Sequence, residues 1–314
     1  MLLALFQALT RRKPRPAWTF QLSVVARFMR LDWDRTADWD LPRVRDEVAN
    51  RPYPRKWVKR VARRDATLGG VPVCVYSPPE RRGDGVLLYF HGGSFIYGSS
   101  KTSHADFLAR LALETGVEIV GVEYRLAPEH PFPAPLEDAL AAWRALLARG
   151  TKPEDVVVGG DSSGGNLAVC AAIALRDAHE PTPRALLLMS PWADLEMPGA
   201  SFRENADYDF GTREVLVRHA AAYAGGAPLD DPRLSPTHAK LEGLPETFVS
   251  WGTCEIPRDD IVAFARALRA AGVSVTEHEA PDMPHNAAFF ADYHPAALAA
   301  FEATARFLGS RGSR

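Results

Sequence analysis

The chain has 314 residues and a formal net charge of −2, with 46% hydrophobic and 24% charged residues. These values are ordinary for a soluble globular protein, and the length is sufficient to bury a full hydrophobic core. No apolar run approaches the roughly 18 residues that a membrane-spanning helix needs.

Residues 1–16, MLLALFQALTRRKPRP, place an apolar stretch before a basic cluster. A secretory signal has the opposite order, so none is predicted. Association of this basic end with anionic lipid is an alternative, but solvated helices are favoured because no amphipathic periodicity is sustained. No nucleic-acid-binding motif is present. The odd number of cysteines (Cys74, Cys170 and Cys254) favours free thiols and a cytoplasmic location.

In chain order, residues 16–30 and 41–50 have helical character, and from residue 66 strand-like and helix-like stretches alternate. The predicted strands are 71–78, 85–92, 117–124, 156–158, 185–192, 247–252 and 273–279. The predicted helices that accompany them are 102–115, 137–149, 166–175, 259–271 and 295–308. This alternation predicts an α/β fold in which helices cover both faces of a mainly parallel sheet.

Residues 193–245 interrupt the alternation, with several prolines and one helical piece near 213–223. We expect this segment and residues 1–65 to form a helical cap over the carboxyl edge of the sheet. The core then consists of residues 66–192 and 246–314.

The stretch VVVGGDSSGGNLAV (156–169) runs from a strand directly into a helix through a glycine-rich turn. The pattern G-x-S-x-G fits only one register, with glycines at 160 and 164, so it places Ser162 at the apex. A serine there is a candidate nucleophile at the carboxyl end of a strand, where open α/β sheets bind ligands. The backbone N–H of Ser163, at the helix start, is placed to stabilise developing negative charge.

Upstream, the strand LLYF ends in His-Gly-Gly-Ser at residues 91–94. Consecutive glycines allow the backbone to approach a ligand closely and to point N–H groups at it. We therefore expect the amides of Gly92, Gly93 and Ser94 to form an oxyanion hole together with that of Ser163.

Three motifs in this order, HGGSF (91–95), YRLAPEHPFPAPLED (124–138) and GDSSGGNLA (160–168), resemble the hormone-sensitive-lipase-like branch of the α/β-hydrolases, and in particular its bacterial esterases. The resemblance covers roughly residues 70–310 and implies the α/β-hydrolase fold and ester hydrolysis. The branch usually has glycine where this chain has Ser94. It often has His-Gly-Phe where this chain has His285-Asn286-Ala287.

In α/β-hydrolases the triad follows the chain order serine, acid, histidine. His285, in the loop after the last predicted strand, is the expected base. The acid is expected after strand 247–252, where EIPRD (255–259) aligns with the D-P-L-x-D that the branch typically carries. This alignment favours Glu255 as the acid and leaves Asp259 as the alternative.

The expected activity is hydrolysis of short- to medium-chain acyl esters by a Ser-His-Glu triad through an acyl-enzyme. Phe95, Trp192 and Phe289 are candidate walls of an apolar substrate pocket. A lactone or N-acetyl amide substrate remains an alternative, as does a non-catalytic receptor for small ligands on the same fold. No motif for a metal or an organic cofactor is present, so none is expected. The chain is expected to act as a monomer or homodimer.

Overall fold

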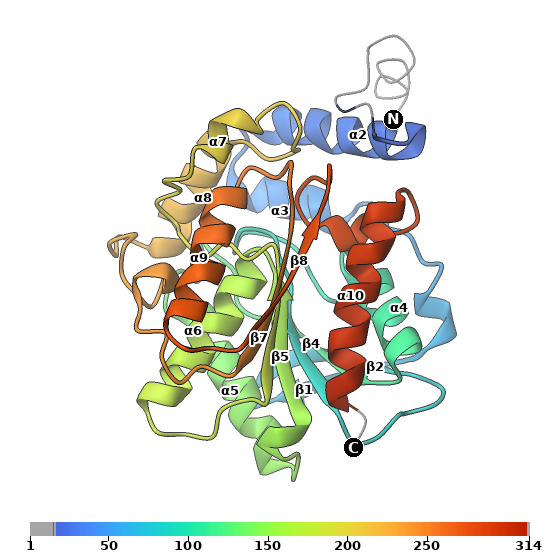
Figure 1. Ribbon diagram of the computed structural model, residues 1–314, viewed down its shortest axis with the longest axis vertical. Coiled ribbons are helices and arrows are strands. Elements are labelled where there is room, and N and C mark those ends of the chain that lie inside the picture. Colours follow the sequence, from blue (N-terminus) through green and yellow to red (C-terminus); the bar gives the residue numbers. More distant parts are fainter. Residues whose placement is uncertain (1–14, 16, 313–314) are drawn as a thin grey trace.

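An eight-stranded sheet lies at the centre of the computed structural model, which describes residue 15 and residues 17–312 (Figure 1). The strand order is β1-β2-β4-β3-β5-β6-β7-β8, and β2 runs antiparallel to both of its neighbours. All pairings from β4 to β8 are parallel. The strands are β1 (Ala62–Leu68), β2 (Val71–Ser77), β3 (Val86–Phe90), β4 (Glu118–Val122), β5 (Val156–Asp161), β6 (Ala185–Met189), β7 (Glu246–Gly252) and β8 (Val275–Ala280). The predicted mainly parallel α/β sheet is therefore confirmed.

Helices cover both faces of this sheet (Figure 1). The helices are α2 (Phe20–Thr36), α3 (Leu41–Ala49), α4 (Ala105–Thr115), α5 (Ala134–Ala148), α6 (Ser163–Asp177), α7 (Ser201–Glu204), α8 (Arg213–Ala224), α9 (Arg258–Ala270) and α10 (Pro295–Gly312). Helices α4 and α10 bury one face, and α5, α6 and α9 bury the other, which gives two separate hydrophobic cores. Every residue of β3, β5 and β6 is buried, which explains why these strands read as continuous apolar runs.

The predicted boundary at residue 65 falls inside β1 and is corrected by the structure. This strand has the polar sequence ARRDATL, and most of its residues are exposed. It is an edge strand that pairs only with β2, and neither of its faces is buried over most of its length, so nothing imposes alternating apolar residues. Its composition therefore carries no strand signal.

Helix α2 begins at Phe20 rather than at residue 16, because Thr19 caps it. The Thr19 hydroxyl accepts a hydrogen bond from the Leu22 amide at 3.1 Å and donates one to the Tyr293 carbonyl at 2.6 Å. The N-terminal helix is thus fixed both to its own first turn and to the core.

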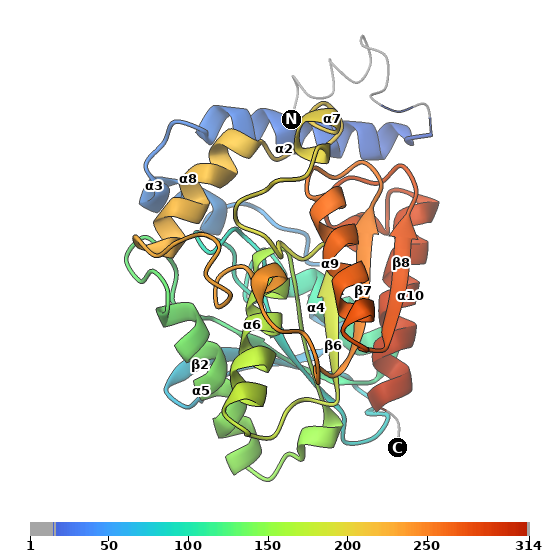
Figure 2. The same ribbon diagram turned by 60° about the vertical axis from the view of Figure 1, so that its left-hand side comes forward.

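Helices α2 and α3 lie beside α7 and α8 at the end of the molecule towards which the parallel strands point (Figures 1 and 2). Arg218 of α8 donates to the carbonyl of Trp39 at 2.9 Å and to that of Ala37, so the two segments contact each other. Arg45 of α3 donates to the Ile96 carbonyl at 2.7 Å, beside the His-Gly-Gly-Ser turn. We call these two segments, residues 17–61 and 193–245, the cap.

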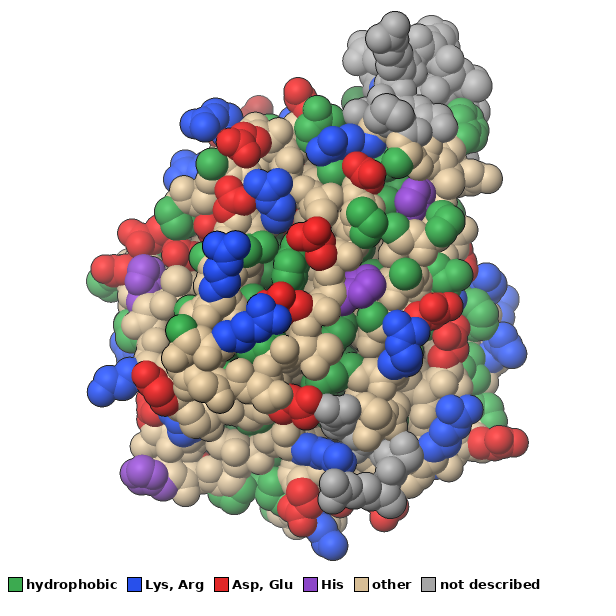
Figure 3. All heavy atoms as spheres, in the orientation of Figure 1, with side chains coloured by type: hydrophobic (Ala, Val, Ile, Leu, Met, Phe, Trp, Pro, Cys, Tyr) green, Lys and Arg blue, Asp and Glu red, His purple; other side chains and the backbone are tan. Residues whose placement is uncertain are grey.

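The three cysteines are buried and unpaired. Among the described residues, no helix combines the length and apolar character needed to cross a bilayer. Acidic and basic side chains are interspersed over the described part of the face in Figure 3. The apolar and basic stretch at residues 1–14 lies outside the described residues, so its predicted role stays a prediction.

Candidate active site

Ser162 occupies a sharp turn between β5 and α6, with φ of 52°. Its amide donates to the Met189 carbonyl at 2.9 Å, and its carbonyl accepts from the Trp192 amide at 3.0 Å. A side chain at Gly160 or Gly164 would collide with the Phe90 carbonyl, so both flanking positions must be glycine. The tight packing of the turn against β3 explains the G-x-S-x-G pattern and exposes the serine at the strand end.

The His-Gly-Gly-Ser turn faces Ser162, but one of its expected donors is already used. The Gly92 amide donates to Asp161 Oδ1 at 2.8 Å, so the prediction that Gly92 contributes to an oxyanion hole is wrong. Among the described residues, no acceptor takes the amides of Gly93, Ser94 or Ser163. Ser94 adopts φ of 55°, the left-handed conformation that glycine provides most easily.

Asp161 connects the turn of Ser162, the His-Gly-Gly-Ser turn and the loop that carries His285. It is 2% exposed and accepts hydrogen bonds from Tyr89 (2.6 Å), Gly92 (2.8 Å) and Asn286 (2.8 Å), with His104 Nε2 at 3.1 Å. Burial raises the pKa of this carboxyl, but His104 and the hydrogen bonds outweigh burial and hold the pKa at about 2. Asp161 is therefore ionised at neutral pH, and its carboxylate holds together the loops that hydrogen-bond to it.

His285 and Glu255 form a hydrogen-bonded pair in which the carboxylate is fully buried and the imidazole side chain is 15% exposed. Nδ1 of His285 lies 2.6 Å from Glu255 Oε2, and Glu255 itself is 0% exposed. The other carboxylate oxygen accepts from the Gly252 amide at 2.6 Å and from the Ser190 hydroxyl at 3.1 Å. Burial lowers the pKa of His285, but the hydrogen bond and charge of Glu255 outweigh burial, so the net pKa is raised. Glu255 thus favours the Nδ1–H tautomer, which leaves Nε2 as a base.

The structure brings Glu255, rather than the alternative Asp259, to His285. Asp259 lies at the start of α9, where its carboxylate accepts from the Ser201 amide at 2.9 Å and pairs with Arg258 at 2.7 Å. This places Asp259 in contact with α7 of the cap and not with the imidazole.

A cavity of about 270 Å³ opens above the strand ends, and Ser162 and His285 both line it. Gly93, Ser94, Trp192 and Phe289 line it as well, together with the aromatic side chains Trp33, Trp39, Tyr97 and Phe210. The Ser162 hydroxyl makes no hydrogen bond with any other described group. In free enzymes such bonds often tighten only when substrate binds.

Phe95 does not line this cavity. It is fully buried and stacks on Tyr223 with ring centroids 3.6 Å apart, so it belongs to the core beneath the site. Its expected role as a pocket wall is corrected. A residue immediately after the His-Gly-Gly-Ser turn carries no sequence signal that distinguishes a pocket wall from a core position.

Two residues of the cap, His219 and Asp209, belong to the site although the sequence did not predict them there. His219 lines the cavity from α8, and burial lowers its pKa to about 3, so it is neutral. Asp209 accepts from the amides of His285 (3.2 Å) and Ile256 (2.8 Å), and it is 5% exposed. Asp209 therefore ties the cap both to the loop after Glu255 and to the loop that carries His285. Nothing in the sequence around Asp209 distinguishes it from its acidic neighbours.

Known proteins resemble this chain over most of its length. Residues 87–289 match the family described as alpha/beta hydrolase fold. An acetyl-hydrolase from Streptomyces hygroscopicus is 39% identical over 236 residues, which are 73% of this chain and 77% of that protein. A carboxylesterase, NlhH, from Mycobacterium tuberculosis is 38% identical over 255 residues, 77% of this chain and 78% of that protein.

The crystal structure of an esterase from the bacterial hormone-sensitive lipase family superimposes with a TM-score of 0.78 at 37% identity, covering 87% of this chain and 98% of that one. The chain therefore belongs to the α/β-hydrolase family, in its hormone-sensitive-lipase-like branch, and is a serine hydrolase that acts on carboxylic ester bonds.

Proposed function

We propose that this enzyme hydrolyses short- to medium-chain acyl esters with a triad of Ser162, His285 and Glu255. The observation that carries this proposal is the 2.6 Å contact between His285 and the fully buried Glu255, in a cavity that Ser162 also lines. Nucleophilic catalysis by serine requires a histidine oriented in this way by a carboxylate.

In the proposed mechanism, Ser162 Oγ attacks the ester carbonyl while Nε2 of His285 accepts the hydroxyl proton. The imidazolium then gives this proton to the leaving alcohol, which leaves an acyl group on Ser162. A water molecule, deprotonated by the same nitrogen, hydrolyses the acyl-enzyme. Glu255 holds the Nδ1–H throughout and stabilises the positive charge on His285.

The tetrahedral intermediates carry a negative oxygen that needs hydrogen-bond donors. The amides of Gly93, Ser94 and Ser163 have no acceptor among the described residues, which makes them the proposed oxyanion hole. The Ser163 amide also belongs to the first turn of α6, where the helix dipole favours negative charge. Loss of one such donor typically costs about 3–4 kcal/mol of transition-state stabilisation.

The cavity suggests a small substrate. Its volume of about 270 Å³ lies below the ~300–1,000 Å³ of typical drug-sized ligand sites. Its aromatic lining, which includes Trp192 and Phe289, suits an apolar acyl chain. We therefore keep these two residues as proposed substrate contacts.

The test is hydrolysis of p-nitrophenyl esters from acetate to palmitate, with a lactone and an N-acetyl amide in parallel. We expect kcat/KM to be highest for acyl chains of up to about eight carbons, which the cavity volume allows. Ser162→Ala should abolish turnover without lowering thermal stability, whereas Ser274→Ala, at an exposed serine, should have no effect. A maximum at palmitate, or a lactone or amide preferred over every ester, would contradict the proposed substrate class. Turnover retained by Ser162→Ala would contradict the nucleophile.

A further inference from the structure

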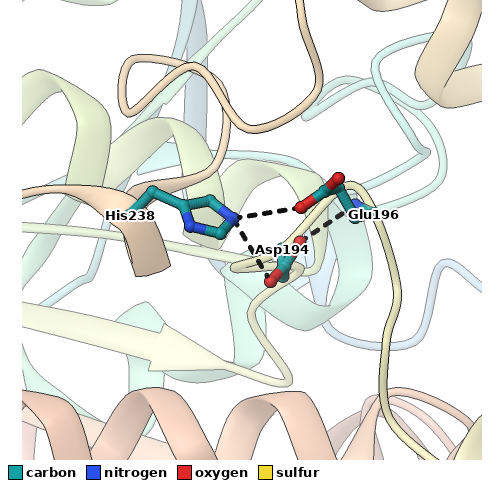
Figure 4. A group of neighbouring side chains, drawn as sticks. All are labelled: Asp194, Glu196 and His238. Carbon is teal, nitrogen blue, oxygen red and sulfur yellow. Dashed lines mark hydrogen bonds and ion pairs between the residues drawn. The ribbon is translucent and has the colours of Figure 1, made fainter.

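Outside the active site, two carboxylates and one imidazole converge at the base of the cap. Asp194 and Glu196 come from the loop that leaves β6, and His238 comes from a short 3₁₀ turn, residues Pro236–His238. Figure 4 shows the His238 ring pointing between the two carboxylates. None of the three residues lines the active-site cavity.

The distances within this cluster differ from those of ordinary hydrogen bonds. His238 Nε2 lies 3.6 Å from Asp194 Oδ2 and 3.4 Å from Glu196 Oε2. A normal N–H···O hydrogen bond spans about 2.7–3.2 Å. In a tetrahedral zinc site with ligand bonds of about 2.0–2.1 Å, neighbouring ligand atoms lie about 3.3–3.4 Å apart. The two distances from His238 are therefore close to those between neighbouring ligands of a zinc ion, and all three ligand atoms lie within 4.8 Å of one another.

A second observation concerns Asp194 alone. Its side chain is only 5% exposed, and its Oδ1 accepts from the Glu196 amide at 2.9 Å. Its Oδ2, which points at His238, receives no hydrogen bond from any described residue. A cation held at this point would neutralise a carboxylate that is largely removed from solvent and whose Oδ2 has His238 only at 3.6 Å.

Hydrogen bonds join the two segments of backbone that carry the cluster. The Leu195 amide donates to the Ser235 hydroxyl at 2.9 Å, and the Thr237 amide donates to the Ala193 carbonyl at 3.3 Å. The two loop segments that supply the ligands, residues 193–196 and 235–238, therefore lie side by side. Glu196 and His238 remain 51% and 36% exposed, so a cation can enter from solvent.

We propose that Asp194, Glu196 and His238 bind one divalent transition-metal ion, with Zn²⁺ as the best fit. Imidazole and carboxylate ligands suit zinc, and water would complete the tetrahedron. The sequence gives no sign of this site, because its ligands lie on two separate loops without a recognisable spacing. The ion would join the two ends of residues 193–245 and so fasten this part of the cap to the core. The site is structural and independent of the ester chemistry.

The test uses the full chain, stripped with EDTA and exchanged into metal-free buffer. Calorimetric titration with ZnCl₂ should show that one Zn²⁺ ion binds per chain and that this binding requires the three proposed ligands. Titration with CaCl₂ should show weaker binding. At free Zn²⁺ of about 100 times Kd, linkage should raise the melting temperature by about 4 °C. Substitution with Co²⁺ should give the visible absorption of a tetrahedral centre.

His238→Ala and Glu196→Gln should each weaken Zn²⁺ binding by more than the ~10–100-fold that second-shell changes cost. Both side chains are partly exposed, so neither variant should unfold. The matched controls are His130→Ala and Glu214→Gln, at exposed positions away from the cluster, and these should bind as the wild type does. Binding that survives in His238→Ala would overturn the site, and so would the absence of any binding below millimolar Zn²⁺.

Discussion

Replacement of Glu255 by glutamine tests the proposed triad most sharply, because it keeps the shape of the side chain and removes only its charge. In the wild type one oxygen of Glu255 contacts His285 Nδ1 at 2.6 Å, and the other accepts from Gly252 and Ser190. The glutamine oxygen can retain the latter two bonds. Its NH₂ group then faces Nδ1 and donates to it.

This reversal forces the imidazole into the tautomer that carries its proton on Nε2, which cannot accept the proton of Ser162. Replacement of the triad carboxylate by its amide in a serine protease lowers kcat by ~10⁴-fold. The equivalent loss here is about 5.5 kcal/mol of transition-state stabilisation. Because Glu255 is completely buried, water cannot replace its charge, so we expect a loss of this order rather than a tenfold one.

The assay is kcat and KM for p-nitrophenyl butyrate from pH 5 to pH 9. Glu255 raises the pKa of His285 in the wild type, so the variant has a more weakly basic imidazole, and raising the pH should not restore its activity. Asp259→Asn is the matched control, because this carboxylate contacts Ser201 and Arg258 instead of His285. If Glu255→Gln retained more than a tenth of wild-type kcat while Asp259→Asn lost it, Asp259 would be the acid.

Two further variants probe carboxylates that the cap and α9 bury. Asp209→Asn should move the acid limb of the kcat/KM profile to lower pH. The negative charge of Asp209 raises the pKa of His285, so its removal keeps the imidazole neutral down to a lower pH. The control is Asp207→Asn, at an exposed neighbouring position, which should leave the acid limb unchanged. An unshifted limb in Asp209→Asn would mean that Asp209 serves only to hold the loops. Asp260→Asn should stabilise the enzyme more at pH 8 than at pH 5, as measured by urea unfolding in EDTA. Burial and the charge of Asp194 raise the pKa of Asp260 from 3.8 to about 7. Its ionisation therefore destabilises the fold increasingly as pH rises from 3.8 to about 7, by at most about 4 kcal/mol. An equal or smaller gain at pH 8 would show that Asp260 ionises freely in the folded enzyme.

The core of the sheet was predictable because its strands are buried on both faces and read as unbroken apolar runs. Ser162 and His285 could be proposed because chain order and the strand ends leave few candidates, and Glu255 because EIPRD aligns with the motif of the branch that the chain resembles. Contacts between loops that are far apart in the chain produce no recognisable sequence pattern. The use of the Gly92 amide by Asp161 and the burial of Phe95 beneath the turn depend on packing that no local pattern encodes. For the same reason the sequence did not single out Asp209.

Asp161 shows most clearly what the pattern alone omits. In G-x-S-x-G it occupies an unspecified position, yet its carboxylate binds the His-Gly-Gly-Ser turn through Gly92 and the loop of His285 through Asn286. Asn286 stands where the branch often has glycine, and its φ of 60° is a left-handed conformation that asparagine tolerates better than other residues with side chains. The departure therefore preserves the backbone that glycine would provide, and it adds a 2.8 Å hydrogen bond that glycine cannot make. Because Asp161 directly precedes Ser162, this bond ties the loop of His285 to the turn of Ser162.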